Sequence, residues 1–129
     1  MRLNQVTVSV RDIDEAITFY RRLGLRLIVR SPHYARFVCP DGGSSFSVHL
    51  CEPGTAIHSR TVVYFESERL DDWAAELQAK GVVFMHGPKD QSWLWREARL
   101  TDPSGNELCL YHAGKNRLHP PWRVQDDEP

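Results

Sequence analysis

Hydrophobic and polar residues alternate at the start of the chain, where Val6, Val8 and Val10 are separated by polar side chains. A period of two predicts a β-strand with one buried face. Over residues 13–20 the apolar positions recur at spacings of three and four, which is typical of an amphipathic helix. The chain therefore opens with a strand that is followed directly by a helix.

The ends of this predicted helix carry residues that favour capping. Asp12 precedes the helix and Glu15 follows three positions later, a spacing that predicts a capping box. Gly24 stands where a left-handed C-terminal cap is expected, since glycine tolerates a positive φ angle. A second helical stripe runs over residues 70–77, and Gly81 ends it in the same way.

The whole pattern occurs twice. A shift of 57 positions places residues 5–8 on residues 62–65, and the two helical stripes then coincide without a gap. Further strand-like segments follow each helix: residues 25–30, 35–39 and 45–51 in the first half, and residues 82–85, 94–101 and 107–111 in the second. The predicted unit is β-α-β-β-β, repeated once. A ferredoxin-like sandwich is the alternative, but it has only two strands between its helices, whereas four strand-like segments lie between these two.

Composition narrows the class of protein. With 129 residues, 41% hydrophobic and 26% charged, the chain fits one globular domain. The formal net charge of −1 gives no electrostatic argument for nucleic acid or a membrane surface as partner. No apolar run reaches the roughly 18 residues of a membrane span, and no signal peptide is visible. Three cysteines without a CxxC motif favour a reducing, cytoplasmic location.

Polar and aromatic side chains collect on the second face of the predicted sheet. Strand alternation places the following residues opposite the apolar face: Gln5, Thr7, Ser9, Ser45, Ser47, His49, Cys51, Val62, Tyr64, Glu66, Glu107, Cys109 and Tyr111. A mixture of hydroxyl groups, thiols, an imidazole and tyrosines is typical of a pocket lining. A solvent-exposed sheet face with scattered polar groups remains the alternative.

Two motifs carry a resemblance to a known family. The first is the strand over residues 3–11 that runs into the helix over residues 12–20 and ends at Leu23-Gly24-Leu25. The second is the turn Asp102-Pro103-Ser104-Gly105-Asn106 with the strand after it. Together they resemble the vicinal oxygen chelate superfamily of glyoxalase I, bleomycin-resistance proteins and extradiol dioxygenases.

The resemblance covers residues 1–112 and implies an α+β fold whose curved sheet surrounds a cup. Unit one is expected over residues 1–53 and unit two over residues 58–112, with a C-terminal tail over residues 113–129. The resemblance also implies a homodimer and a small-molecule ligand or substrate.

Metal-using members of this superfamily place ligands on the first and last strand of each unit. Carried over by position, these four places are Gln5, His49, Val62 and Cys109. Valine has no donor atom, and a thiol replaces the usual carboxylate at the last place. The resemblance therefore implies, at most, a divalent metal (Zn, Ni, Fe or Mn) on Gln5, His49 and Cys109.

Two hypotheses for the function follow. In the first, the protein is a metal-assisted lyase, isomerase or dioxygenase, in which Glu66 or Glu107 moves a proton. In the second, it binds an aromatic compound without metal, as bleomycin-resistance proteins do. The expected ligand-binding residues are Tyr64, Trp93, Trp95, Arg96, Tyr111 and His112. Three of these carry alternatives. Arg96 either anchors an anionic group or pairs with a nearby carboxylate, and the tryptophans Trp93 and Trp95 wall a pocket or lie in a dimer interface.

Overall fold

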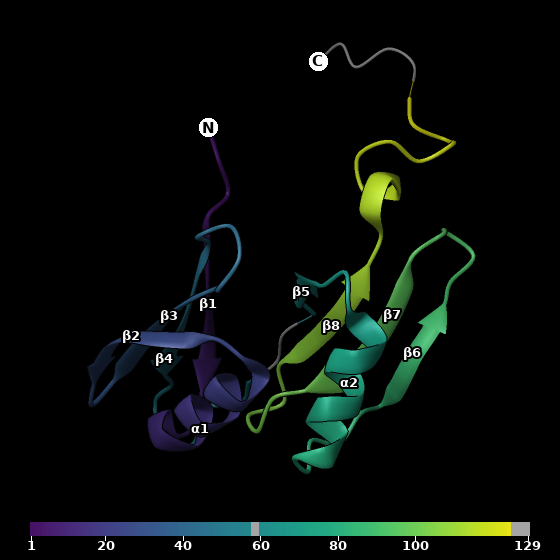
Figure 1. Ribbon diagram of the computed structural model, residues 1–129. Helices are drawn as coiled ribbons and strands as arrows, with labels where there is room; N and C mark the ends of the chain where they lie inside the picture. The colour runs from purple at the N-terminus through teal and green to yellow at the C-terminus, as the bar shows by residue number, and fades with distance from the viewer. Residues whose placement is uncertain (58–59, 125–129) are drawn as a thin grey trace. The chain divides into compact units, whose positions relative to one another are not determined.

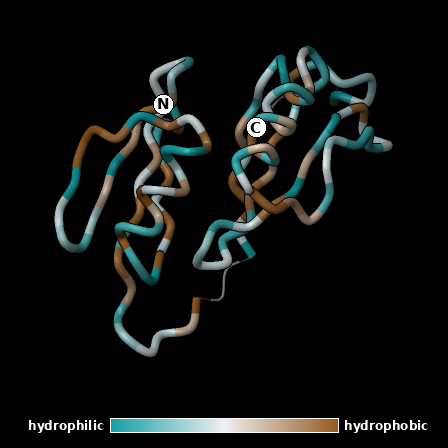
Figure 2. Tube along the Cα trace, turned by 60° about the horizontal axis from the view of Figure 1, so that its bottom comes forward, coloured by the Kyte–Doolittle hydropathy of each residue, from teal (hydrophilic) through white to brown (hydrophobic). Residues whose placement is uncertain are grey.

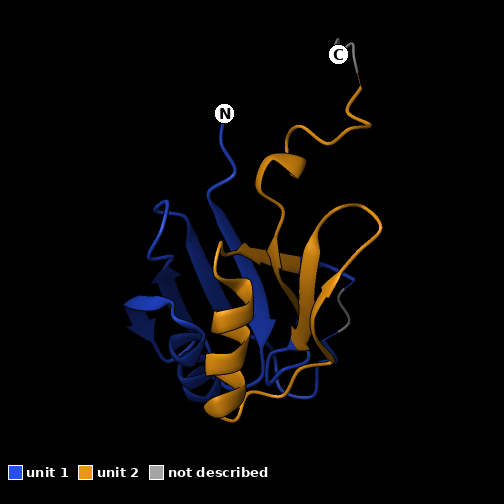
Figure 3. Cartoon of the chain, turned by 45° about the vertical axis from the view of Figure 1, so that its right-hand side comes forward, with its two compact units in different colours: residues 1–62, 101–107 blue, residues 63–100, 108–129 orange. Residues whose placement is uncertain are grey.

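The structure is a computed structural model that describes residues 1–57 and 60–124 (Figure 1). The acidic end of the predicted tail, residues 125–129, lies outside the described residues, as do residues 58 and 59. The chain divides into two compact units (Figure 3). Unit 1 comprises residues 1–62 and 101–107, and unit 2 comprises residues 63–100 and the chain from residue 108 onward. The turn between the last two strands thus belongs with unit 1, although it is far away in sequence.

Unit 1 contains one helix and a four-stranded sheet. Its elements are β1 (Gln5–Val10), α1 (Ile13–Leu23), β2 (Arg26–Ser31), β3 (Tyr34–Val38) and β4 (Ser45–Leu50). The strand order is β1-β4-β3-β2, with β1 parallel to β4 and the other pairs antiparallel. Hydrophobic and polar residues are interleaved along the chain (Figure 2), and in β1 and β4 they alternate strictly. Helix α1 contacts β2, β3 and β4, so one face of the sheet packs against it.

Unit 2 repeats this arrangement. Its elements are β5 (Val62–Glu66), α2 (Leu70–Ala79), β6 (His86–Asp90), β7 (Arg96–Thr101), β8 (Glu107–His112) and a short 3-10 helix η1 (Gly114–Asn116). The strand order is β5-β8-β7-β6, which matches that of unit 1 strand for strand. The predicted doubled β-α-β-β-β architecture is therefore confirmed. No helix within the described ranges has the length and apolar character needed to cross a membrane.

The predicted ends of α1 are confirmed in detail. The Asp12 side chain accepts a hydrogen bond of 2.9 Å from the backbone N–H of Glu15. Gly24 has a φ angle of 116°, and its N–H bonds back to Arg21. The buried positions of the helix are the predicted apolar stripe: Ile13, Ala16, Ile17, Tyr20 and Leu23.

The sixth strand lies later in the chain than the predicted segment over residues 82–85, so that prediction was wrong. Gly81 has a φ angle of 89°, and the N–H of Val82 bonds back to Leu77 at the end of α2. Val82 is buried as the hydrophobic residue that follows a helix C-terminal cap. Strand β6 instead begins at His86 and includes Pro88, which an edge strand tolerates because part of its backbone needs no partner.

A buried polar network joins α1 to the turn over residues 102–106 inside unit 1. The Tyr20 hydroxyl donates to Asp102 at 2.7 Å. The same carboxylate accepts from the backbone N–H groups of Ser104 and Asn106 at 2.9 and 2.8 Å, and from the Asn106 amide at 2.9 Å. Asn106 also donates to the Ser9 carbonyl at 2.8 Å, which ties the turn to β1. Because every buried group has a partner, the network holds the turn in a single arrangement.

Burial, together with the charge of Asp102, raises the pKa of Tyr20 above its ordinary value of 10.0. The unfolded chain therefore loses this phenol proton at lower pH than the folded chain does. The contribution of the protonated Tyr20 phenol to the free energy of unfolding is complete below pH about 10. It is lost as the pH rises above this value, by up to about 1.4 kcal/mol per pH unit.

Replacing Tyr20 with Phe is expected to reduce this loss of stability at alkaline pH. The substitution also leaves Asp102 with one donor fewer, which lowers the free energy of unfolding at neutral pH by about 1–3 kcal/mol. Urea unfolding of the wild type and the variant between pH 7 and pH 11 measures both effects. An unchanged alkaline slope in the variant would show that another group causes the dependence.

Candidate functional site

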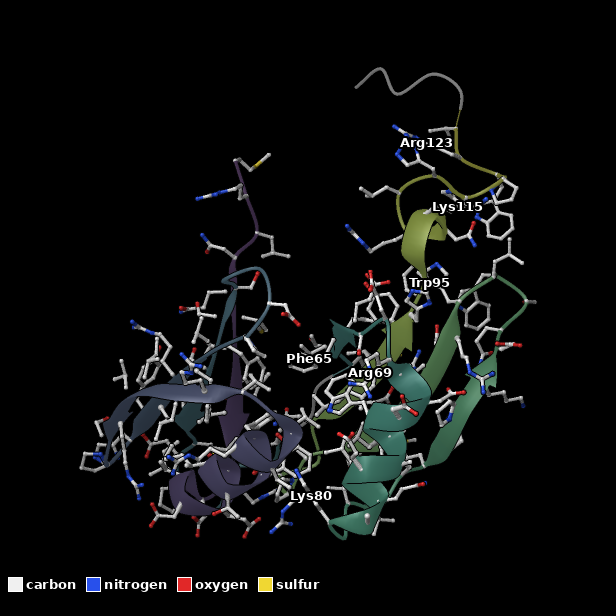
Figure 4. All side chains as sticks on the ribbon, in the orientation of Figure 1. Phe65, Arg69, Lys80, Trp95, Lys115 and Arg123 are labelled. Atoms are coloured by element: carbon white, nitrogen blue, oxygen red, sulfur yellow. The ribbon has the colours of Figure 1, made fainter. Side chains whose placement is uncertain are left out.

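Three aromatic rings meet on the sheet face of unit 2 that lies opposite α2. Tyr64 comes from β5, Tyr111 from β8, and Trp95 from the residue before β7 (Figure 4). Trp95 and Tyr111 are stacked, with ring centroids 4.7 Å apart and planes inclined by 20°. Tyr64 stands edge-on to both, at 5.5 Å from Tyr111 and 6.0 Å from Trp95. We call these three residues the aromatic cluster.

Hydrogen bonds fix the rings in place. The Trp95 indole N–H donates to the carbonyl of Asn116 in η1 at 3.2 Å. The Tyr64 hydroxyl accepts from Arg99 at 3.3 Å, and the Arg99 guanidinium lies 5.6 Å from the centre of the Tyr64 ring. Tyr111 is buried, whereas Tyr64 is 44% exposed. The cluster therefore presents a rigid aromatic surface, with a cation against one of its rings.

Glu97 and Arg99 form a buried ion pair beside the cluster. The Glu97 side chain is only 3% exposed and lies 3.1 Å from Arg99. Its other oxygen accepts from the indole N–H of Trp93 at 2.8 Å. Trp93 is therefore held by Glu97 and is not part of the aromatic cluster. Arg99 was missed from the sequence, although it shares the alternation of Trp95 and Glu97 on β7.

The predicted acid–base residue Glu66 caps η1. One carboxylate oxygen accepts from the backbone N–H groups of Ala113 and Gly114 at 2.8 and 3.0 Å. The other lies 3.7 Å from the Arg117 guanidinium. Burial and the nearby Glu66 charge raise the pKa of Tyr111. The second predicted residue, Glu107, lies half-buried at the first position of β8; proton transfer by either carboxylate stays a prediction.

Two further predicted ligand-binding residues are not part of the aromatic cluster. Arg96 pairs with Asp71 of α2 at 2.9 Å and with Asp90 of β6 at 3.0 Å. Of the two alternatives for Arg96, the structure therefore has the ion pair with nearby carboxylates. The hydrogen bond from Arg96 lowers the pKa of Asp71. Arg96 thus faces α2 and not the aromatic cluster. His112 ends β8, and its ring lies beside Gly114.

The three predicted metal ligands fall in both units, with Gln5 and His49 in unit 1 and Cys109 in unit 2. The Gln5 amide oxygen accepts from the Ser45 hydroxyl at 2.7 Å. His49 is exposed and pairs in register with Ser9, four positions along β1 from Gln5. Cys109 is completely buried.

This donor set does not fit the divalent metal that the resemblance implies. The fourth place, Val62, adds no donor, and the Gln5 amide oxygen is already engaged. Among the described residues no group of three or more His, Cys, Asp or Glu side chains could hold a metal ion. The predicted metal site stays a prediction.

Unit 1 presents a face of a different character, opposite α1. Its polar positions are Gln5, Thr7 and Ser9 on β1, Ser45, Ser47 and His49 on β4, Tyr34 and Arg36 on β3, and Arg26 on β2. We call this set the polar face. The register places Arg36 opposite Ser47 and Tyr34 opposite His49, so these side chains are neighbours. Tyr34 and Arg36 were not singled out from the sequence.

A pocket of about 290 Å³ borders this face along the edge of β1. It is lined by Val6, Thr7, Val8, Ser9, Cys51, Thr55, Ala56, Ile57, Thr61 and Asn106. All of these residues belong to unit 1. The lining combines hydroxyl and amide groups with an apolar floor, which suits a small organic molecule.

Comparison with known proteins assigns the class. A model of the Glyoxalase/Bleomycin resistance protein/Dioxygenase superfamily matches residues 2–110. The chain therefore belongs to this superfamily, as the resemblance implied. An uncharacterised protein of Mycolicibacterium smegmatis (strain ATCC 700084 / mc(2)155) is 31% identical over 109 residues, which cover 84% of this chain and 91% of that protein.

Solved structures of the same fold include a resistance determinant, a binding protein and an enzyme. A bleomycin resistance determinant encoded on the transposon Tn5 is 20% identical with a TM-score of 0.74, covering 87% of this chain and 98% of that one. Lactoylglutathione lyase from Agrobacterium tumefaciens is 16% identical with a TM-score of 0.74, covering 92% and 96%. A bleomycin-binding protein complexed with bleomycin is 21% identical with a TM-score of 0.72, covering 87% and 98%. At these identities the likeness shows the fold alone.

The buried pair of Glu97 and Arg99 gives a test of how the aromatic cluster is supported. Glu97→Gln removes the buried carboxylate charge that lies 3.1 Å from the Arg99 guanidinium, so the free energy of unfolding is expected to fall by about 3 kcal/mol. Asp72→Asn is the control, because the ion pair of Asp72 with Arg69 is exposed and contributes about 0–1 kcal/mol. Urea unfolding of both variants makes the comparison. Equal effects would show that Glu97 does not stabilise the cluster through its charge.

Proposed function

We propose that this protein binds a planar aromatic small molecule on the aromatic cluster of unit 2, without metal and without chemistry. The observation that carries the proposal is the exposed ring of Tyr64, held edge-on against a stacked tryptophan and tyrosine. Aromatic contacts of this kind add about 0.5–1.5 kcal/mol each beyond the area they bury. Because the rings are fixed before binding, little conformational entropy is lost when a ligand arrives.

Each neighbouring group has a defined part in this binding. Arg99 keeps the Tyr64 ring in position from its hydroxyl end, and Glu97 balances the charge of Arg99. Asn116 holds the Trp95 indole through its carbonyl, while Glu66 caps the helix that carries Asn116. The complexed bleomycin-binding protein supports the proposal as a protein of the same fold with a bound small molecule. The expected cytoplasmic location and homodimer stay predictions.

Binding is tested with a panel of planar aromatic compounds that includes bleomycin, by fluorescence titration and isothermal calorimetry. For a compound that binds, Tyr64→Ser is expected to raise the dissociation constant about tenfold, equivalent to about 1.4 kcal/mol. Tyr64→Phe keeps the ring and is expected to bind much like the wild type. Trp122→Ser is the matched control, because Trp122 is an exposed aromatic residue of the tail.

Two outcomes would contradict the proposal. One is that no compound of the panel binds the wild-type protein. The other is that Tyr64→Ser and Trp122→Ser bind a compound equally well, which would place the ligand elsewhere.

Metal dependence is tested on protein purified without chelator. We expect no stoichiometric divalent metal and no thermal stabilisation by Zn²⁺, Ni²⁺, Fe²⁺ or Mn²⁺, because Val62 supplies no donor and Gln5 is already hydrogen-bonded. His49→Ala is then expected to leave the metal content unchanged. Stoichiometric metal that disappears in His49→Ala would overturn this expectation and support the metal-assisted enzyme.

A further inference from the structure

We propose that the polar face of unit 1 is a binding site for the oxyanion group of a small molecule, a carboxylate or a phosphate, with Arg36 as its anchor. The proposal rests on residues of unit 1 alone. It is therefore independent of aromatic binding in unit 2, and either can fail without the other.

The first argument is the charge of the face. Its nine positions carry hydroxyl groups, one amide, one imidazole and the guanidinium groups of Arg26 and Arg36, but no carboxylate. The comparable face of unit 2 carries Glu66 and Glu97, each paired with an arginine. A concentration of donors and positive charge without an internal counter-ion favours an anion from outside.

The second argument is that Arg36 is held on the polar face without a carboxylate partner among the described residues, whereas the half-buried Arg99 of unit 2 is paired with Glu97. The arginines with such partners are Arg30 with Asp14, Arg69 with Asp72, Arg96 with Asp71 and Asp90, Arg99 with Glu97, and Arg117 with Glu66. Arg36 is half-buried, and its Nε donates to the Tyr34 hydroxyl oxygen at 2.9 Å. This bond orients the guanidinium and leaves its two terminal amino groups for a forked contact with an oxyanion.

The third argument is the hydrogen-bonded chain behind Arg36. The Tyr34 oxygen accepts from Arg36 at 2.9 Å, and the neighbouring Ser47 hydroxyl, followed by Arg36, lowers the pKa of Tyr34. Ser47 lies 2.5 Å from the Thr7 hydroxyl, so the donors continue across β4 to β1. Tyr20 shows the opposite case, since its hydroxyl donates to Asp102 and its pKa is raised. The surroundings of Tyr34 therefore stabilise negative charge.

The fourth argument is space. The 290 Å³ pocket is lined by Thr7 and Ser9 of the same face, together with the Asn106 amide. Its apolar residues, among them Val8 and Ile57, suit the hydrocarbon part of a ligand. The pocket shares Thr7 with the row Thr7–Ser47–Arg36 that the strand register defines across β1, β4 and β3. A molecule with one carboxylate or phosphate group on a short carbon chain matches this combination.

The test uses non-aromatic probes, so that binding to the aromatic cluster of unit 2 does not contribute to the titration. Inorganic phosphate and butyrate are titrated at low ionic strength and followed by protein NMR, with butyramide as the uncharged comparison. We expect saturable binding of at least one of the two anions and none of butyramide, and the tighter probe identifies the class of oxyanion. Absence of saturable binding by both anions would overturn the proposal.

The variants test the anchor. Arg36→Gln is expected to weaken binding at least about tenfold, while Arg36→Lys retains the charge without the fork and weakens it less. Arg21→Gln, an exposed arginine in the last turn of α1, is the matched control and is expected to bind like the wild type. Equal affinity of Arg36→Gln and Arg21→Gln would overturn the assignment. If Arg36→Gln fails to fold, Arg36→Lys still tests the anchor, because this variant keeps the positive charge and loses the forked contact.

A second readout comes from the Tyr34 phenol. Its titration is obtained as the ultraviolet difference between the wild type and Tyr34→Phe, with and without saturating anion. A bound anion beside Arg36 opposes ionisation of the phenol, so the Tyr34 midpoint is expected to move to higher pH. A midpoint that does not move, with the anion bound, would place the anion away from Arg36 and overturn the proposal.

Discussion

The buried carboxylate of Asp102 is the constraint on which unit 1 depends. Removing a charge from water is costly unless its oxygens are fully hydrogen-bonded, and here four donors from Tyr20, Ser104 and Asn106 meet them. The turn meets this requirement in part by aiming the backbone N–H groups of Ser104 and Asn106 at one oxygen. The turn is therefore part of unit 1, and because it also connects β7 to β8, it sets where the last strand begins.

The two sheets share a topology but present different chemistry. Strand alternation gives each an apolar face beneath its helix and a second face that is free to vary. In unit 1 this second face carries hydroxyl groups and unpaired positive charge around Arg36. In unit 2 it carries stacked rings, and its carboxylates are used in ion pairs and in capping η1. The duplicated fold thus presents two sheet faces of different chemistry.

The fold was largely predictable, whereas the sites were only partly so. The caps at Asp12 and Gly24 and the repeated alternation depend on local sequence, and the structure has them where they were expected. Strand β6 was misplaced because the apolar residue Val82 follows a helix cap and does not begin a strand. Arg96 was placed with the ligand-binding residues because a shift of one residue in strand register moves a side chain to the other face.

The residues missed in unit 1 show why a family pattern is insufficient for finding a site. The pattern directs attention to the first and last strands of each unit, whereas Tyr34 and Arg36 lie on β3 between them. Their significance depends on what is absent from the neighbouring strands: no carboxylate occurs among the register partners on β1 and β4. The same absence disfavours a divalent cation at Gln5 and His49, because these residues share the face with Arg26 and Arg36. The positive charge of Arg26 and Arg36 repels a metal ion and attracts an oxyanion, so it disfavours the metal site and favours an anion on the same face.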